Sequence, residues 1–132
     1  MNGLLILAEA ATGHPDSTLS ILRAGINRAQ AAAGPVSLDL CLIARIEAQA
    51  AERGAHDFEI NCIDADGRDR LPTIRGQFES PHGAGSNNIL MKIKTAVQEF
   101  GVYEFNLIVD RIQLASWTLR VERIGEAGNA NA

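Results

Sequence analysis

Residues 36–46 read VSLDLCLIARI, and every even-numbered position of this segment is apolar. The odd-numbered positions include Asp39 and Arg45. Neighbouring side chains of a β-strand point to opposite faces of the sheet, so this alternation predicts a strand that buries one face. Cys41 and Ile43 interrupt the polar set, which predicts that the middle of the second face is covered as well.

The same alternation recurs along the chain, between turn signals rich in Gly, Pro, Asp and Asn. Short strands at regular turn spacing predict an all-β protein, a two-layer antiparallel β-sandwich of about eight strands, Ig-like or C2-like. A change of parity predicts a β-bulge at Gly25. A second change, near Leu114 or Ala115, fits either a bulge or a strand buried on both faces. The predicted strands are 4–10, 18–27, 36–46, 58–62, 74–78, 89–94, 103–109 and 115–121.

Three further segments, 27–34, 46–54 and 95–101, are predicted to be loops with room for one helical turn each. The first two contain good helix formers, but all three are shorter than the roughly 12 residues that a marginally stable helix needs. The segment 89–94 carries both lysines of the chain on one face, and charged side chains protect the edges of sheets. We therefore expect 89–94 to be an edge strand.

The composition of the chain argues against several classes of function. The chain has 132 residues and a formal net charge of −4, which argues against binding to nucleic acid through phosphate contacts. It contains no run of about 18 apolar residues, so no membrane segment is expected. Two cysteines, Cys41 and Cys62, form no disulfide framework, and we expect a reduced, cytoplasmic protein in which both pack in the core. Residues 1–124 are expected to form one domain and 125–132, GEAGNANA, a disordered polar tail.

Short motifs stand at both ends of the chain, at Leu7, Ala8, Ala10, Ala11, Leu19, Ile21, Leu22, Gly25, Gly101, Tyr103, Phe105, Leu107, Asp110, Ala115, Ser116 and Trp117. In these motifs the chain resembles a family of small, uncharacterised bacterial proteins, a domain of unknown function. The resemblance implies a β-sandwich and brings no activity. The chain departs from the family at Arg111, where members usually carry Gly. A type I′ turn needs positive φ at both of its central residues, so the form of the last hairpin turn stays open.

The alternating faces also predict the core. Tyr103, two residues after Gly101, resembles a tyrosine corner, in which the phenol bonds back to nearby backbone. Trp117 is expected in the core because aromatic side chains dominate core burial. The residues expected to be buried are Leu38, Leu40, Leu42, Phe58, Ile60, Ile93, Tyr103, Phe105, Leu107 and Trp117.

The sequence DADGRD offers the three carboxylates of Asp64, Asp66 and Asp69 as weak candidates for a Ca²⁺ site. The spacing is not that of an EF-hand, and neighbouring arginines would neutralise the carboxylates. A hairpin turn with Asp66 and Gly67 in left-handed conformations fits better. We therefore expect no metal site and no cofactor.

The three histidines, His14, His56 and His82, lie in or beside predicted turns and share no metal-ligand spacing. No nucleophile motif is visible. The long connection PHGAGSNN, residues 81–88, is a candidate functional loop, because glycine-bearing loops over a rigid sheet often carry sites. Its candidate residues are His82, Ser86 and Asn87.

Three functions follow from these observations. The first is a non-catalytic binding or structural module that acts through loops or an edge strand, with a protein partner or by self-association. The second is a Ca²⁺- or small-ligand-binding sandwich that uses the DADGRD loop. The third is an enzyme of unrecognised class. The absence of a catalytic constellation in the sequence favours the first.

Overall fold

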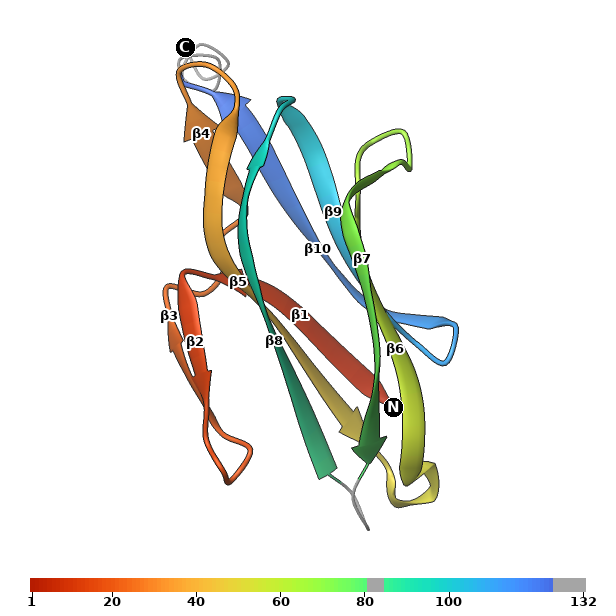
Figure 1. Ribbon diagram of the computed structural model, residues 1–132. Coiled ribbons are helices and arrows are strands. Elements are labelled where there is room, and N and C mark those ends of the chain that lie inside the picture. Colours follow the sequence, from red (N-terminus) through yellow and green to blue (C-terminus); the bar gives the residue numbers. More distant parts are fainter. Residues whose placement is uncertain (81–84, 125–132) are drawn as a thin grey trace.

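The computed structural model describes residues 1–80 and 85–124 (Figure 1). The protein is all-β, as the alternation predicts, and the described residues form ten strands rather than eight. The strands are β1 (Asn2–Ala8), β2 (Ala10–Gly13), β3 (Leu19–Leu22), β4 (Arg28–Ala31), β5 (Val36–Ala48), β6 (Gly54–Ile63), β7 (Asp69–Ser80), β8 (Gly85–Val97), β9 (Gly101–Val109) and β10 (Ile112–Arg123). One 3₁₀ turn, η1 (Ala50–Glu52), connects β5 to β6.

The strands form a sandwich of two principal sheets. One has the order β1-β5-β8 and the other β4-β10-β9-β6-β7, while β2 and β3 form a separate hairpin. The pairs within these sheets are antiparallel except for β4, which runs parallel to β10. β10, which follows all the other described strands in the chain, therefore lies inside the larger sheet between β4 and β9.

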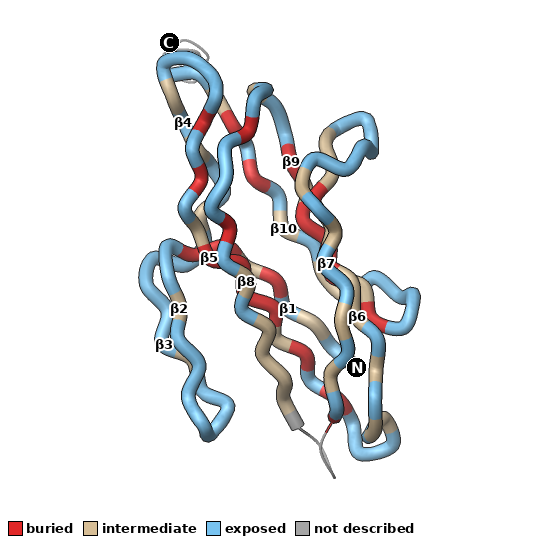
Figure 2. Tube along the Cα trace, in the orientation of Figure 1, coloured by how far each residue is buried: buried red, intermediate tan, exposed pale blue. Residues whose placement is uncertain are grey.

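The core lies between the two sheets, where the alternating apolar faces meet (Figure 2). Leu42 of β5, Phe105 and Leu107 of β9 and Leu119 of β10 are at most 1% exposed. Most of the residues predicted to be buried are buried. Leu40, Phe58 and Trp117 are exceptions, because each is only half-buried.

Two of these exceptions have a visible cause. The Phe58 ring lies over Gly76 of the neighbouring strand β7, where an added Cβ would come within 2.8 Å of the ring. Because glycine has no side chain, the ring lies against the backbone of β7 at this point and no side chain of Gly76 extends over it. The indole Nε1 of Trp117 donates a hydrogen bond to the carbonyl of Ile26 at 2.8 Å, which holds the ring at the rim of the core.

The β2–β3 hairpin covers the outer face of the smaller sheet. Ala8, Cys41 and Ile43 form a second buried cluster, against which Ala11 of β2 and Leu19 of β3 pack. The prediction that Cys41 and Ile43 lie under a cover is therefore confirmed. Both cysteines are buried free thiols, and burial raises the pKa of the Cys62 thiol to about 12.

Arg45 fastens the turn of this hairpin to the sheet. Its Nη1 donates to the carbonyl of Ser17 at 3.0 Å and to Asn88 Oδ1 at 3.3 Å, and Nη2 donates to Ser86 Oγ at 3.2 Å. Asn88 Nδ2 also donates to the Ser17 carbonyl, at 3.0 Å. Two strands, β5 and β8, thus hold one loop carbonyl.

Several predicted boundaries are wrong. Residues 28–31, predicted to be a loop, form β4, because they pair with the distant strand β10. The first predicted strand breaks at Glu9 into β1 and β2, and the second is only Leu19–Leu22. β5 and β8 extend to Ala48 and Val97, into two segments predicted to be loops. The predicted tail 125–132 lies outside the described residues.

The predicted bulge in the last strand and the tyrosine corner are present, whereas Gly25 lies in the connection between β3 and β4 rather than in a bulged strand. The register of β10 against β9 shifts between Gln113 and Ala115. The backbone N–H groups of Gly25 and Ile26 both donate to the carbonyl of Leu7, and Gly25 has φ of +94°. The Tyr103 hydroxyl donates to the carbonyl of Glu99 at 2.5 Å.

The β9–β10 turn has the form that the sequence left open. Asp110 and Arg111 have φ of +48° and +68°, so the two-residue turn is left-handed at both positions although neither residue is glycine.

Candidate binding surface

Asp64 organises the DADGRD turn. Its Oδ1 accepts hydrogen bonds from the backbone N–H of Asp66 at 2.9 Å and of Arg68 at 3.0 Å, and its Oδ2 accepts one from Arg70 Nε at 2.6 Å. The bond from the Arg68 backbone, and then that from Arg70, hold the pKa of Asp64 below its usual range. A cation bound at Asp64 would have to displace these donors.

The other two candidate carboxylates, Asp66 and Asp69, are exposed. Gly67 has φ of +79°, but Asp66 does not take the predicted left-handed conformation. Within residues 1–80 and 85–124, no three His, Cys, Asp or Glu side chains come together as a group that could hold a metal ion.

The candidate loop 81–88 is shorter than predicted. Ser86 and Asn87 belong to β8, where they pair with Glu47 and Ile46 of β5, so neither lies in a loop. The strand extends this far because its pairing with β5 continues to Gly85. His82 lies outside the described residues.

Two histidines are described, and their positions differ. His14 lies in the turn of the β2–β3 hairpin as predicted, with Nε2 at 2.7 Å from Ser20 Oγ. His56 lies within β6 rather than in a loop, and its side chain is only 14% exposed. Its ring stacks on Phe78 of β7, with the ring centroids 5.4 Å apart.

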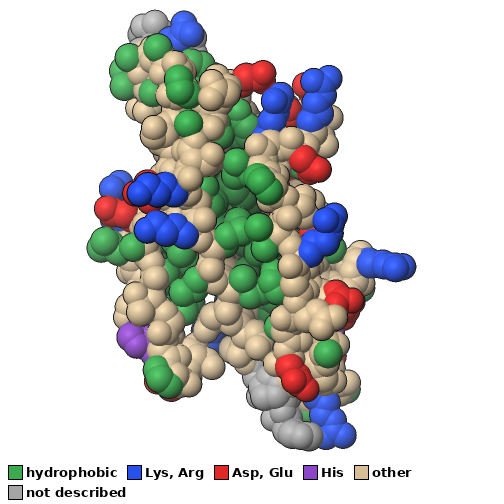
Figure 3. Space-filling view, in the orientation of Figure 1, with side chains coloured by type: hydrophobic (Ala, Val, Ile, Leu, Met, Phe, Trp, Pro, Cys, Tyr) green, Lys and Arg blue, Asp and Glu red, His purple; other side chains and the backbone are tan. Residues whose placement is uncertain are grey.

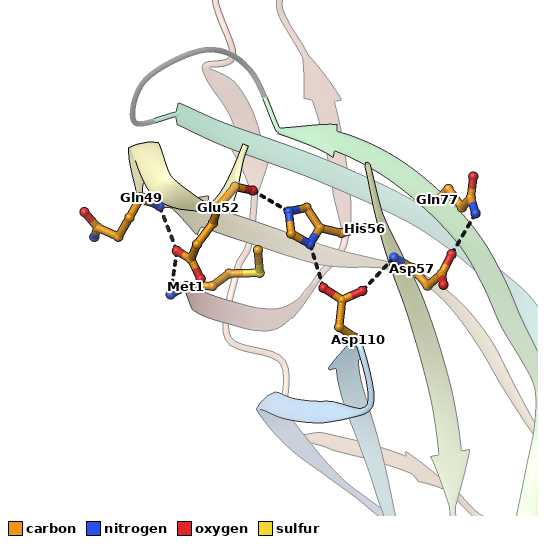
Figure 4. A network of polar contacts seen from close by, with 7 residues as sticks. All are labelled: Met1, Gln49, Glu52, His56, Asp57, Gln77 and Asp110. Carbon is orange, nitrogen blue, oxygen red and sulfur yellow. Dashed lines mark hydrogen bonds and ion pairs between the residues drawn. The ribbon is translucent and has the colours of Figure 1, made fainter. Parts of the chain in front are cut away.

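His56 joins three segments of the chain (Figure 4). Its Nδ1 lies 2.6 Å from Oδ2 of Asp110 in the β9–β10 turn, and its Nε2 bonds to the main-chain carbonyl of Glu52 in η1. Asp110 Oδ1 accepts the backbone N–H of Asp57 at 3.0 Å, and the Asp110 N–H donates to the Asp57 carbonyl at 2.9 Å. We call His56, Asp110 and the Glu52 carbonyl the His56 clamp.

The clamp favours a charged histidine. Both ring nitrogens face oxygen atoms that only accept hydrogen bonds, and a neutral imidazole carries only one N–H. The hydrogen bond with Asp110, and then that with the Glu52 carbonyl, raise the pKa of His56. The bond with His56 in turn lowers the pKa of Asp110.

The clamp differs from a catalytic histidine–carboxylate pair in one respect. In a hydrolytic triad the nitrogen remote from the carboxylate faces a nucleophile. Here that nitrogen, Nε2 of His56, bonds to a backbone carbonyl. In this arrangement His56 cannot accept a proton from a nucleophile, and the pair holds the ends of β6 and β9 together.

Sequence reasoning missed the clamp because Asp110 lies 54 residues from His56. One signal was present in the chain. His56 has the same parity as Phe58, Ile60 and Cys62, so the alternation of β6 extends back to it and places it on the inner face.

An open groove of about 680 Å³ lies on the outer face of the larger sheet. Its charged lining groups mostly satisfy one another. Arg75 Nε donates to Glu59 at 2.8 Å, Gln77 donates to Asp57 at 2.8 Å, and Asp110 belongs to the clamp. This groove therefore offers few free groups to a ligand.

The two sides of the sandwich differ. At one side β1 packs tightly on β10, since a Cβ added at Gly3 would lie 2.7 Å from Leu114 Cβ. At the other side are β7 and β8. Among the described strands β7 pairs only with β6, and β8 only with β5. The prediction that 89–94 is an edge strand is confirmed for the described part of the chain.

Apolar side chains are accessible on this open side. Figure 3 shows hydrophobic side chains gathered in the middle of the face where Figure 1 places β8 and β7. Ile74 is 39% exposed although it pairs with the buried Ile60 and so points to the inner face. We call the exposed or half-buried inner-face residues here the apolar seam: Phe58, Leu71, Ile74, Phe78, Ile89 and Met91.

These features define a small all-β sandwich protein with one closed and one open side. Its sequence matches the model of a family of unknown function (DUF6941) over residues 3–122, and the chain belongs to this family. No curated protein matches the sequence. The described part of the chain contains no helix with the length and hydrophobicity that a membrane crossing requires.

Proposed function

We propose that this protein is a non-catalytic binding module that accepts an extended segment of a partner protein along its open side. The observation that carries this proposal is the apolar seam between two long edge strands, β7 of 12 residues and β8 of 13. An edge strand presents unpaired N–H and C=O groups, and an extended peptide can add to it as a further strand.

The apolar seam would add burial of apolar side chains to the backbone hydrogen bonds of an added strand. Alternate side chains of an added strand would point inward and cover residues such as Ile74, Ile89 and Met91. Burial of exposed apolar surface stabilises a complex by roughly 25 cal/mol per Å² before the costs of association. The buried cysteines without a disulfide support a cytoplasmic location for the module.

Selection from a displayed library of random peptides tests this function. Two isoleucines provide matched variants, because Ile74 on the seam is 39% exposed and Ile112 at the β9–β10 turn is 65% exposed. Selected peptides should bind the wild type and Ile112→Asp equally, and Ile74→Asp at least tenfold more weakly. Bound peptide should also slow hydrogen exchange along β8.

Two outcomes would overturn the proposal. A library that yields no binder contradicts it directly. Peptides that bind Ile74→Asp as well as they bind the wild type would place the interaction elsewhere on the molecule.

A further inference from the structure

The free edge of β8 carries two positive charges that form no close ion pair with a described residue. Lys92 and Lys94 are the only lysines of the chain, and both are exposed on the outer face of this strand. Neither forms an ion pair with any residue in the described part of the chain. On β5, Lys92 lies opposite Cys41 and Lys94 opposite Asp39. This charge contrasts with the net charge of −4 of the whole protein.

A strand added to β8 would meet two different surfaces. Directly opposite residues in neighbouring strands have Cβ atoms about 5 Å apart, and successive side chains alternate between faces. One set of its side chains would therefore lie beside Lys92 and Lys94. The other set would lie over Ile89 and Met91, on the apolar seam.

We propose that the occupant of the open side is a segment of a partner protein in which acidic and apolar side chains alternate, and that this segment pairs with β8. This inference rests on the function proposed above and names the chemistry of the partner. Opposite charges facing each other across a strand pair stabilise it. Carboxylates of the partner would give Lys92, which faces Cys41, a counter-charge and would give Lys94, which faces Asp39, a second one on its free side.

The charges favour β8 over β7 as the pairing edge. On β7, Arg70 is paired with Asp64 and Glu99, and Arg75 with Glu59. Pro72 also lacks the N–H that a ladder hydrogen bond needs. The exposed cations of β7 are therefore already neutralised, and its backbone is interrupted.

The same charges disfavour the chain itself as the occupant. If β8 of a second copy paired antiparallel around Lys92 and Lys94, lysine would face lysine, and like charges in register are destabilising. Residues 125–132 read GEAGNANA and hold no large apolar side chain to cover the seam. A separate partner meets both requirements.

Two synthetic nonapeptides of alternating sequence, Val–Glu and Val–Lys, test the inference by fluorescence anisotropy with the whole chain at low salt. We expect the Glu peptide to bind about tenfold more tightly, since it gains two opposite-charge pairs. Attraction by net charge alone would favour the Lys peptide, because the protein is negative. Tighter binding of the Glu peptide would therefore result from the local charges of Lys92 and Lys94 and not from the net charge of the protein.

The variant Lys92→Glu with Lys94→Glu should reverse this preference. Arg111→Glu with Arg120→Glu is the matched control, because it changes the net charge equally at two exposed sites in or beside β10, which belongs to the other sheet. The control should keep the preference for Glu. Lys92→Gln with Lys94→Gln introduces no new charge and should abolish the preference. This milder variant keeps the test valid if the double Glu variant does not fold.

The outcomes separate the two proposals. If the Glu peptide has no advantage while library peptides still bind at Ile74, this inference is wrong and the binding function stands. If neither the nonapeptides nor the library bind, both proposals are overturned.

Discussion

His56 links the stability of the fold to pH. The pKa of His56 is raised in the folded protein, so its contribution is fully present below the unfolded pKa of about 6.5 and is lost as pH rises through the folded value. The pH dependence that Asp110 contributes has the opposite sign. Because its pKa is lowered in the folded protein, its contribution to stability is present above the unfolded pKa of about 3.9 and is lost as pH falls through the folded value.

We therefore expect the free energy of unfolding to fall between about pH 6 and pH 9 more steeply in the wild type than in His56→Gln. Urea titrations at the two pH values measure this difference, and groups common to both proteins cancel. At the lower pH His56→Gln should cost about 1–3 kcal/mol, the usual cost of a lost charged hydrogen bond. Equal pH dependence in the two proteins would contradict the prediction.

Arg111 is a second residue for which the effect of a substitution on stability can be predicted. It is exposed, makes no ion pair with a described residue, and has φ of +68°. A left-handed conformation costs a non-glycine residue about 1–2 kcal/mol, and glycine gives back part of this through its larger unfolded-state entropy. Arg111→Gly should therefore stabilise the protein by about 0.5–1 kcal/mol in thermal or urea unfolding.

Arg120 provides the control for this measurement. It is exposed like Arg111 but lies inside β10, opposite Val102. Because glycine weakens a strand interior, Arg120→Gly should destabilise the protein by about 0.5–1 kcal/mol. Destabilisation by both substitutions would show that the turn conformation carries no strain.

The β2–β3 hairpin acts as a cover, and the two thiols report its opening. Arg45→Ala removes one of the two side chains that bind the Ser17 carbonyl, so the hairpin should open more often. We expect Ellman's reagent to label Cys41 about tenfold faster in this variant, which corresponds to one lost hydrogen-bonding group. Cys62 lies in the main core and should be unaffected. Equal acceleration of both thiols would indicate global unfolding instead.

Element by element, the sequence predicts what local alternation controls. β5, β6, β9 and β10 lie where apolar side chains recur at every second position, and Cys41 and Ile43 revealed the hairpin cover. β4 escaped prediction because its sequence, RAQA, has little apolar contrast and becomes a strand only by pairing with β10. The His56 clamp escaped for the same reason, since Asp110 approaches His56 only through the tertiary fold.

At the level of the whole protein, most strand pairing is distant in sequence. β5 lies between β1 and β8, and β4 pairs with β10. Sheets built from such pairs fold slowly, because loop closure costs entropy before the contacts form. We expect refolding to take milliseconds to seconds. Stopped-flow measurements of Trp117 fluorescence would give this rate. Refolding within microseconds would contradict the observed topology.

The interior position of β10 has a consequence for synthesis in the cell. While a ribosome is still making residues 112–123, β4 and β9 each lack the neighbour that the finished sheet gives them. Until β10 has been made, the nascent chain therefore carries unsatisfied strand edges and an uncovered apolar face, and such features favour aggregation.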